Sequence, residues 1–301
     1  MSADEFLALA RALERRHRVE GGKGFRLRDH AADDAGPLRS MDKATANANL
    51  EDAIGVLTRR QDMMYAQDRW SLLLIFQAMD AAGKDGAIKH VMSGVNPQGC
   101  SVHSFKAPSH EELDHDFLWR CATRLPARGM IGIFNRSYYE EVLVVRVHPQ
   151  LLAGQPLPDE LRHKDIWDER FRDIRNFEQH LHDNGTIVRK IFLHVSRDEQ
   201  RRRFLERIDE PEKHWKFSER DVAERAHWDR YMECYEDAIK NTASKECPWY
   251  VIPADRKWYT RLAVSAVVTE VLASIDVHYP KPTKERAAAL AKARASLEAE
   301  G

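Results

Sequence analysis

The chain has 301 residues, and its 47 lysines and arginines against 48 aspartates and glutamates give a net charge of −1. A general nucleic-acid-binding protein carries a basic excess, so nucleic acid is not an expected partner. Hydrophobic residues make up 43% of the chain, which excludes a disordered protein. No apolar run approaches the roughly 18 residues of a membrane span, so we expect no membrane partner. Four cysteines without zinc-ligand spacing and an N-terminus unlike a signal peptide favour the cytoplasm.

The predicted elements alternate between helices and strands. Residues 1–20 and 42–69 have helical patterns, and they flank an irregular segment. Five apolar runs then predict strands buried on both faces, at 71–77, 101–105, 130–134, 186–195 and 249–253. Helices separate these runs, so the expected fold is α/β, with a five-stranded parallel sheet between layers of helices.

Local signals place several helix ends. Ser109-x-x-Glu112 and Ser196-x-x-Glu199 have the capping-box pattern of helix starts. A helix over 159–182 is expected to stop at Asn184-Gly185. We expect three regions: an N-terminal helical extension (1–70), a core (71–280) and a C-terminal helical tail (281–301).

A candidate phosphate loop follows the first strand directly. The sequence Ala78-Met-Asp-Ala-Ala-Gly-Lys-Asp-Gly86 joins a strand to a helix through small residues and a Gly-Lys pair. Ala81, Ala82 and Gly83 allow a close approach of the backbone, whose N–H groups would point at the anion. Lys84 would reach the outer phosphates. The match to the Walker A pattern is imperfect, because Ala78 replaces its first glycine and Asp85 its final Ser/Thr; the alternative is an ordinary strand–helix turn.

Carboxylates inside this loop indicate a metal or phosphate-orienting role. Asp80 would repel a phosphate unless it holds Mg²⁺ or orients the incoming group, and Asp85 could share that role. The turn after the third strand carries Arg136, a candidate phosphate clamp, because ligands of open α/β sheets bind beyond the carboxyl ends of strands. Glu140 and Glu141 follow as metal or nucleotide contacts, or alternatively as acids that suit a helix N-terminus.

A charged segment resembles a kinase lid in its layout. Arg203 and Arg207 are four residues apart and share one helix face. Pro211 breaks that helix, Lys213 and Lys216 follow in a connector, and Ser218-x-x-Asp221 is expected to cap the next helix. Basic residues on a helix–connector–helix unit over a phosphate loop fit a lid at about 197–240. The alternative is a solvated surface with ion pairs one turn apart.

Together, these segments resemble the polyphosphate kinase 2 family from about Phe25 to Tyr279. The resemblance rests on five segments in order: AMDAAGKDG (78–86), SGVNPQGC (93–100), FNRSYYEEVLVVRVHP (134–149), DEPEKHWKFS (209–218) and WYVIPADRKWY (249–259). It implies a P-loop kinase-like three-layer fold with a helical lid. It also implies phosphoryl transfer between inorganic polyphosphate and nucleotides, and the loop and third-strand segments look most like the branch that phosphorylates both AMP and ADP.

The resemblance also implies roles for individual residues. Asp80, Lys84 and Arg136 would be catalytic, and the lid residues Arg203, Arg207, Lys213 and Lys216 would hold polyphosphate or nucleotide phosphates. The implied phosphate and nucleotide contacts are Ala81, Ala82, Gly83, Asp85, Gly86, Asn135 and Glu140. The family pattern commonly has Asp where this chain has Asn135. A neutral amide is a poor metal ligand, so the expected metal carboxylates are Asp80, Asp85 and Glu140.

The implied cofactor is Mg²⁺, with Mn²⁺ as a substitute. The implied partners are inorganic polyphosphate, AMP, ADP and ATP, guanine nucleotides as further acceptors, and other copies of the chain in a dimer or tetramer. Two other readings stay open at this point. An ATP-dependent nucleoside or nucleotide kinase would share the loop and lid. A non-catalytic nucleotide-binding regulator would explain the departures at Ala78, Asp85 and Asn135.

Overall fold

A six-stranded sheet forms the centre of the computed structural model, which describes residues 3–41 and 43–300. The strand order is β1-β6-β5-β2-β4-β3. The strands are β1 (Arg18–Val19), β2 (Ser71–Ala78), β3 (Cys100–Ser104), β4 (Ile131–Asn135), β5 (Thr186–His194) and β6 (Trp249–Pro253). The five predicted strands are all present, and each pairs in parallel with its neighbours in this set. Their carboxyl ends therefore lie at one edge of the sheet.

The sixth strand corrects the prediction for the N-terminus. β1 pairs antiparallel with β6, so the sheet is mixed and has six strands rather than five. The helix predicted over residues 1–20 is α1 (Ala3–His17), which ends before this strand. A two-residue strand is too short to show a periodic pattern, which is why the sequence did not indicate it. The expected helix positions 1, 2 and 42 lie outside the described residues.

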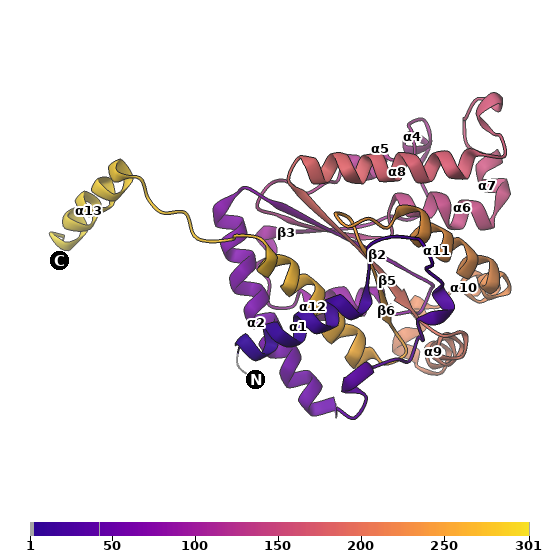
Figure 1. Ribbon diagram of the computed structural model, residues 1–301, viewed down its shortest axis with the longest axis horizontal. Helices are drawn as coiled ribbons and strands as arrows, with labels where there is room; N and C mark the ends of the chain where they lie inside the picture. The colour runs from indigo at the N-terminus through magenta and orange to yellow at the C-terminus, as the bar shows by residue number, and fades with distance from the viewer. Residues whose placement is uncertain (1–2, 42, 301) are drawn as a thin grey trace.

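Helices cover both faces of the sheet (Figure 1). On one face, α1 and α2 (Lys43–Gln67) pack against α12 (Lys257–Ser274), which also contacts α3 (Lys84–Val91). On the other face, α8 (Ile166–Asp183) contacts β5 and α11 (Trp228–Thr242). The remaining α-helices are α4 (His110–Leu113), α5 (Trp119–Ala122), α6 (Val144–Val147), α7 (Pro149–Ala153), α9 (Arg197–Asp209), α10 (Glu219–Ala223) and α13 (Lys284–Glu298). This arrangement confirms the expected three layers.

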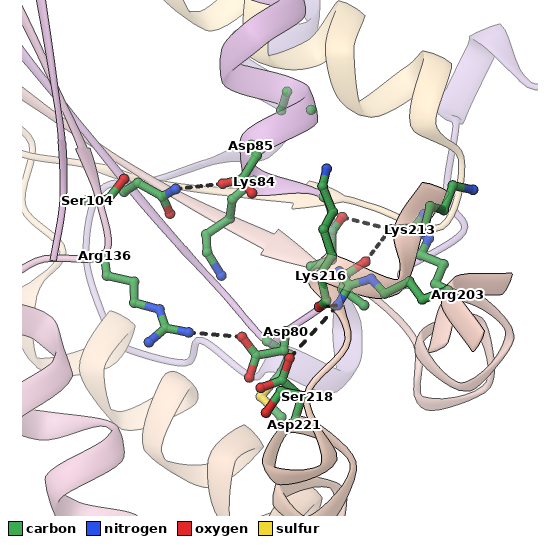
Figure 2. Close-up of a pocket in the computed structure, with 18 of the residues that line it drawn as sticks. Asp80, Lys84, Asp85, Ser104, Arg136, Arg203, Lys213, Lys216, Ser218 and Asp221 are labelled. Atoms are coloured by element: carbon green, nitrogen blue, oxygen red, sulfur yellow. Dashed lines mark hydrogen bonds and ion pairs between the residues drawn. The ribbon is translucent and has the colours of Figure 1, made fainter. Parts of the chain in front are cut away.

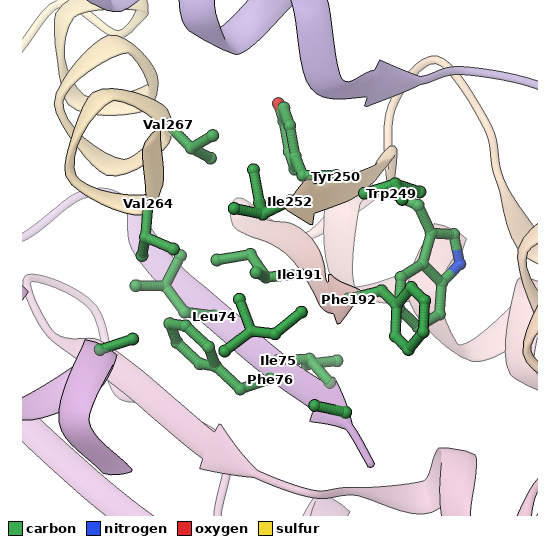
Figure 3. Packing of buried hydrophobic residues seen from close by; sticks show 14 of the residues in the cluster. Leu74, Ile75, Phe76, Ile191, Phe192, Trp249, Tyr250, Ile252, Val264 and Val267 are labelled. Atoms are coloured by element: carbon green, nitrogen blue, oxygen red, sulfur yellow. The ribbon is translucent and has the colours of Figure 1, made fainter. Parts of the chain in front are cut away.

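The central strands are buried on both faces, as their continuous apolar runs predict. All eight residues of β2 are buried, and so are all five of β6. Figure 3 shows Val264 and Val267 of α12 close to Ile252 of β6. Burial of apolar surface is the main driving force for folding, so this packing holds β2 in the core, and the candidate phosphate loop follows directly from it.

The predicted helix ends agree with the structure in most places. Ser109 and Glu112 form a reciprocal capping box. Ser196 accepts a bond from the Glu199 backbone, but the Glu199 carboxylate binds arginines instead of completing the box. α8 ends at Asp183, next to Asn184 and a Gly185 with a φ of 83°. It starts at Ile166, later than predicted, because residues 159–161 form a separate 3-10 turn.

The two ends of the chain differ in their packing. Phe6, Ala10 and Leu13 of α1 belong to the same buried cluster as the strands. Helix α13 projects away from the body, and its residues are exposed (Figure 1). The division at residues 70 and 280 stays a prediction. Among the described residues, no helix combines the length and apolar character that crossing a bilayer requires.

A buried polar network holds the segment after β4. Lys190 on β5 donates to Glu178 on α8 at 2.5 Å, and both side chains are almost completely buried. The Glu178 carboxylate also accepts hydrogen bonds from the hydroxyls of Tyr138 and Tyr139. A buried charge is tolerated when it is paired and hydrogen-bonded in this way. The two tyrosines thereby anchor the chain next to Arg136.

The buried His17 should make the stability of the fold depend on pH. The His17 ring bonds the Tyr259 hydroxyl at 2.8 Å, and burial lowers the pKa of His17 to about 4. Between this value and the unfolded pKa of about 6.5, the unfolded chain binds more protons, so stability falls as pH falls through this window. We expect this residue to contribute a loss of up to about 3 kcal/mol.

Urea unfolding at a series of pH values measures the effect. His17→Gln removes the titrating ring, so the slope of unfolding free energy against pH should become shallower between about pH 6.5 and 4. His110→Gln changes an exposed histidine and should leave the slope unchanged. Equal slopes for wild type and His17→Gln would contradict the prediction.

Candidate active site

A pocket of about 890 Å³ lies at the carboxyl edge of the sheet. It receives residues from the loop after β2, the ends of β3 and β4, the segment around α9 and α10, and the start of α12. Of the predicted site residues, all of which the structure describes, thirteen line the pocket: Asp80, Ala81, Ala82, Gly83, Lys84, Asp85, Gly86, Asn135, Arg136, Arg203, Arg207, Lys213 and Lys216. Two predicted residues do not line it: Glu140, and Glu141, whose carboxylate pairs with Arg170 on α8.

The loop after β2 has the backbone geometry of a tight strand–helix turn. Ala81 has a φ of 60° and Gly83 a φ of 105°, both in the left-handed region. Such a conformation is strained for alanine, and strain of this kind is commonly found at functional sites. Lys84 begins α3, and its ammonium donates to the carbonyl of Ala78 at 2.8 Å. Burial lowers the pKa of Lys84, while the nearby Asp80 carboxylate acts in the opposite direction.

Arg136 lies where the third-strand motif predicts a phosphate clamp. Its backbone has a φ of 65°, and its guanidinium donates to Asp80 at 2.9 Å. Figure 2 shows Lys84, Arg136 and Asp80 converging on the same space. The half-buried Glu140 is the main cause of the raised pKa of Arg136, followed by Asp80. Burial raises the pKa of Glu140 itself. The negative charge of Glu140 therefore favours the charged form of Arg136.

Asn135 and Asp85 form a second polar pair in the pocket. The Asn135 amide donates to the Asp85 carboxylate at 2.7 Å. An aspartate at position 135 would place two carboxylates at this distance, which is unfavourable unless a cation lies between them. The neutral Asn135 amide instead forms a favourable hydrogen bond with the Asp85 carboxylate.

The cations predicted for the lid separate into two groups. Arg203 is buried, and its guanidinium hydrogen-bonds protein atoms at Ala81, Ala82, Ala254, Asp255 and Glu199. This environment differs from the one expected for a polyphosphate ligand, because the N–H groups already have acceptors.

The second group of predicted lid cations is more accessible. Arg207 is half-buried and lies 3.9 Å from Asp221, and Lys213 pairs with Glu210. Lys216 is exposed, with its ammonium 4.8 Å from the ring centroid of Trp215. The 3-10 turn Pro211–Lys216 carries both lysines. Ser218 occupies the expected N-cap position of α10, but its side chain makes no capping hydrogen bond.

Several pocket residues were not predicted from the sequence. They include Ser104 at the end of β3 and Lys106 after it, Trp215 and Asp221 in the lid segment, and Lys257 and Arg261 in α12. Lys106, Lys257 and Arg261 follow the carboxyl ends of parallel strands, so the strand-end rule that indicated Arg136 could also have indicated them. Trp215 is 79% exposed, which is high for an aromatic side chain.

The charge of the pocket differs sharply from that of the whole chain. Nine cationic and four acidic side chains line it, an excess of five, whereas the chain has a net charge of −1. Burial, with the negative charge of Asp80 next in size, raises the pKa of Asp221. A concave site lined with positive charge concentrates anions and binds several phosphate groups at once.

The residues present fit a metal that substrate phosphates help to hold. Within residues 3–41 and 43–300, no group of three His, Cys, Asp or Glu side chains could hold a metal. Asp80 and Asp85 nevertheless line the pocket beside the phosphate loop. Mg²⁺ commonly binds through one or two carboxylates, with water and substrate phosphates as its other ligands. The donor set therefore matches Mg²⁺ bound together with substrate.

The mostly parallel sheet, the loop after its central strand β2 and the cationic pocket define a phosphate-binding α/β protein of the P-loop kinase type. The family model described as "Polyphosphate kinase 2 (PPK2)" matches residues 40–281. The chain belongs to this family.

Individual relatives cover most of the chain. A protein from Rhodopseudomonas palustris named "ADP-polyphosphate phosphotransferase" is 57% identical over 249 residues, which are 82% of this chain and 86% of the relative. A Meiothermus ruber protein named "AMP/ADP-polyphosphate phosphotransferase" is 43% identical, over 89% and 96% of the two chains. The crystal structure of polyphosphate kinase 2 from Arthrobacter aurescens TC1 superposes with a TM-score of 0.84 at 38% identity, covering 94% and 95%. This likeness confirms the P-loop kinase-like fold.

Replacing Lys84 tests the role of the phosphate loop. Lys84→Ala removes the ammonium that lies beside Asp80, so turnover should fall by at least about a hundredfold, the scale of one lost transition-state charge contact. Steady-state kinetics measure this loss, and a thermal unfolding curve checks that the fold is intact. Lys89→Ala, on the exposed side of the same helix, should keep wild-type turnover. Near-normal turnover in Lys84→Ala would contradict a catalytic role for the phosphate loop.

Proposed function

We propose that this protein is a phosphotransferase, a polyphosphate-dependent nucleotide kinase that transfers a phosphoryl group between inorganic polyphosphate and AMP or ADP. The observation that carries the proposal is the cationic excess of a pocket built around a phosphate loop. Both substrates are polyanions, so they approach each other only where positive charge compensates their repulsion. Membership of the polyphosphate kinase 2 family and the names of the relatives support polyphosphate as the donor, in preference to ATP.

The reaction exchanges one phosphoanhydride bond for another. A terminal phosphate oxygen of the nucleotide attacks the end phosphorus of polyphosphate, and a new anhydride bond forms. The bond to the next phosphate breaks, and the shortened polyphosphate leaves with the electron pair. One bond of the same type is broken and one is formed, so the transfer can run in both directions. The attacking oxygen is already ionised at neutral pH, so no general base is required.

The chain's own residues would then position and neutralise the substrates. The ammonium of Lys84 and the guanidinium of Arg136 lie on either side of the space next to Asp80, where the transferring group would sit. The backbone N–H groups at the start of α3 would bind a phosphate. Arg207, Lys213 and Lys216 would hold further phosphates from the lid. Phosphoryl transfer depends mainly on this positioning and charge compensation.

A divalent cation, Mg²⁺ with Mn²⁺ as a substitute, would be held by Asp80 together with substrate phosphates, with Asp85 next to them. When bound, it supplies charge shielding between the two polyanions. We also propose that guanine nucleotides act as acceptors, that the protein forms a dimer or tetramer, and that it works in the cytoplasm. These parts of the proposal rest on the sequence and the resemblance.

A donor-exchange assay tests the proposed function. Purified protein is incubated with ADP, Mg²⁺ and long-chain polyphosphate, and ATP formation is measured; AMP, GMP and GDP are tested in parallel. ATP should form with polyphosphate, and Lys84→Ala should form at least about a hundredfold less. In a second reaction, ATP and a nucleoside replace polyphosphate and ADP. Phosphorylation of the nucleoside without any use of polyphosphate would identify an ATP-dependent kinase, and nucleotide binding without turnover a regulator.

The two aspartates of the pocket should differ in importance. Asp80→Asn removes the carboxylate that pairs with Arg136 and faces Lys84, so kcat/KM should fall by about a hundredfold or more at every Mg²⁺ concentration. Asp85→Asn likewise replaces a carboxylate by an amide of the same shape. Because Asp85 pairs with a neutral amide, the decrease in kcat/KM should be smaller in this variant. Kinetics over a Mg²⁺ titration compare the two variants. Most of the activity surviving in Asp80→Asn at saturating metal would contradict this assignment.

A further inference from the structure

Helix α9 hydrogen-bonds three successive carbonyls of the phosphate loop. The side-chain amide of Gln200 donates to the carbonyl of Asp80 at 2.9 Å. One terminal nitrogen of Arg203 donates to the carbonyls of Ala81 and Ala82, at 3.0 and 2.7 Å. Gln200 and Arg203 are three residues apart and therefore lie on the same face of the helix. This face of α9 is in direct contact with the back of the loop.

The orientation of these carbonyls matters for anion binding. A phosphate loop works because its N–H groups point at the anion, whereas carbonyl oxygens in the same place would repel it. The left-handed backbone at Ala81, with its φ of 60°, carries a strain that only surrounding contacts can maintain. The bonds from α9 supply such contacts, because each one pairs a loop carbonyl with a side-chain donor and so fixes the direction of its peptide group.

Arg203 has no N–H group left for a substrate. Its second terminal nitrogen donates to the carbonyls of Ala254 and Asp255, after β6, and its Nε donates to Glu199. These bonds bring its total to five, which equals the number of N–H donors in a guanidinium group. The side chain is 4% exposed. Arg203 therefore joins the phosphate loop to the end of β6.

Other contacts fix the same part of α9. The backbone N–H of Ser196, at the N-cap, donates to the Asp255 carboxylate at 2.8 Å. Gln200 accepts from Arg225, whose guanidinium also binds the carbonyl of Arg197. Beyond Arg203 the contacts change, because Arg207 and the two lysines of residues 211–216 face the pocket or solvent.

We propose that Gln200 and Arg203 are positioning residues that hold the phosphate loop in its anion-binding conformation. The first two turns of α9 are then a fixed support for the loop, and the substrate-binding part of the lid begins at Arg207. This inference rests on the proposed function, since it assigns a supporting role within the same site. It also gives different roles to two arginines on the same helix face: Arg203 holds the phosphate loop, whereas Arg207 is available to polyphosphate.

The first test uses hydrogen exchange of the substrate-free protein, which does not depend on any activity. In Arg203→Lys the charge is kept but the five-donor fork is lost, so backbone amides of residues 79–87 should exchange at least about tenfold faster than in wild type. Gln200→Ala, which removes a single bond to the loop, should give a smaller increase in the same amides. Wild-type exchange in both variants would overturn the proposal, whatever reaction the protein catalyses.

The second test separates positioning from polyphosphate binding. If Arg203 positions the loop, Arg203→Lys should lower kcat by about a hundredfold and equally for short and long polyphosphate. If it binds polyphosphate as a charge, lysine should restore most activity, and any remaining loss should appear in KM for long chains and depend on salt. The second pattern would overturn the proposal.

Two comparison variants complete the design. Arg201→Ala removes the same charge from an exposed position on α9 and should leave both exchange and kinetics unchanged. Lys213→Ala/Lys216→Ala should raise KM for long polyphosphate without changing exchange at residues 79–87. If the loop amides exchange faster in Arg203→Lys while wild type shows no transfer from polyphosphate, the support role stands and the proposed function fails.

Discussion

The geometry of the site depends on one constraint, which is that the loop after β2 must turn its N–H groups toward an anion and its carbonyls away. Every carbonyl turned inward to the protein needs a donor, because an unpaired buried polar group is costly. Lys84 supplies one to Ala78, and the side chains of α9 supply the others to residues 80–82. Hydrogen bonds therefore join the end of β2, the phosphate loop and the first lid helix, α9.

A second requirement is to gather positive charge on one side of a nearly neutral chain. The parallel strands achieve this, because all their carboxyl ends lie at one edge and each following segment can place a cation there. Arg136 follows β4, and the buried network of Glu178, Lys190 and two tyrosines holds its segment. The acids of the pocket are few, and Asp80 faces the cations of the loop and of the segment after β4.

The elements that could be predicted are those whose signal is local. β2 was found because it is buried on both faces, which leaves a continuous apolar run bounded by polar residues. β1 was missed because it has two residues, and its partner β6 lies more than two hundred residues later in the chain. The box at Ser109 formed as predicted, but the one at Ser196 formed only in part, because Glu199 has nearby arginines that bind it more strongly than a backbone N–H does.

The class of the fold, the position of the phosphate loop and the charged residues around it could be inferred from the sequence, because strand burial and loop composition are properties of consecutive residues. The role of each cation, in contrast, depends on how distant segments come together in the folded chain. Arg203 and Arg207 look equivalent on a helix face, yet one is buried against backbone carbonyls and the other lines the pocket. Lys257 and Arg261 join the site from a helix that starts more than 170 residues after Lys84. The role of a charged side chain depends on the acceptors within hydrogen-bonding distance, and folding brings those from distant parts of the chain.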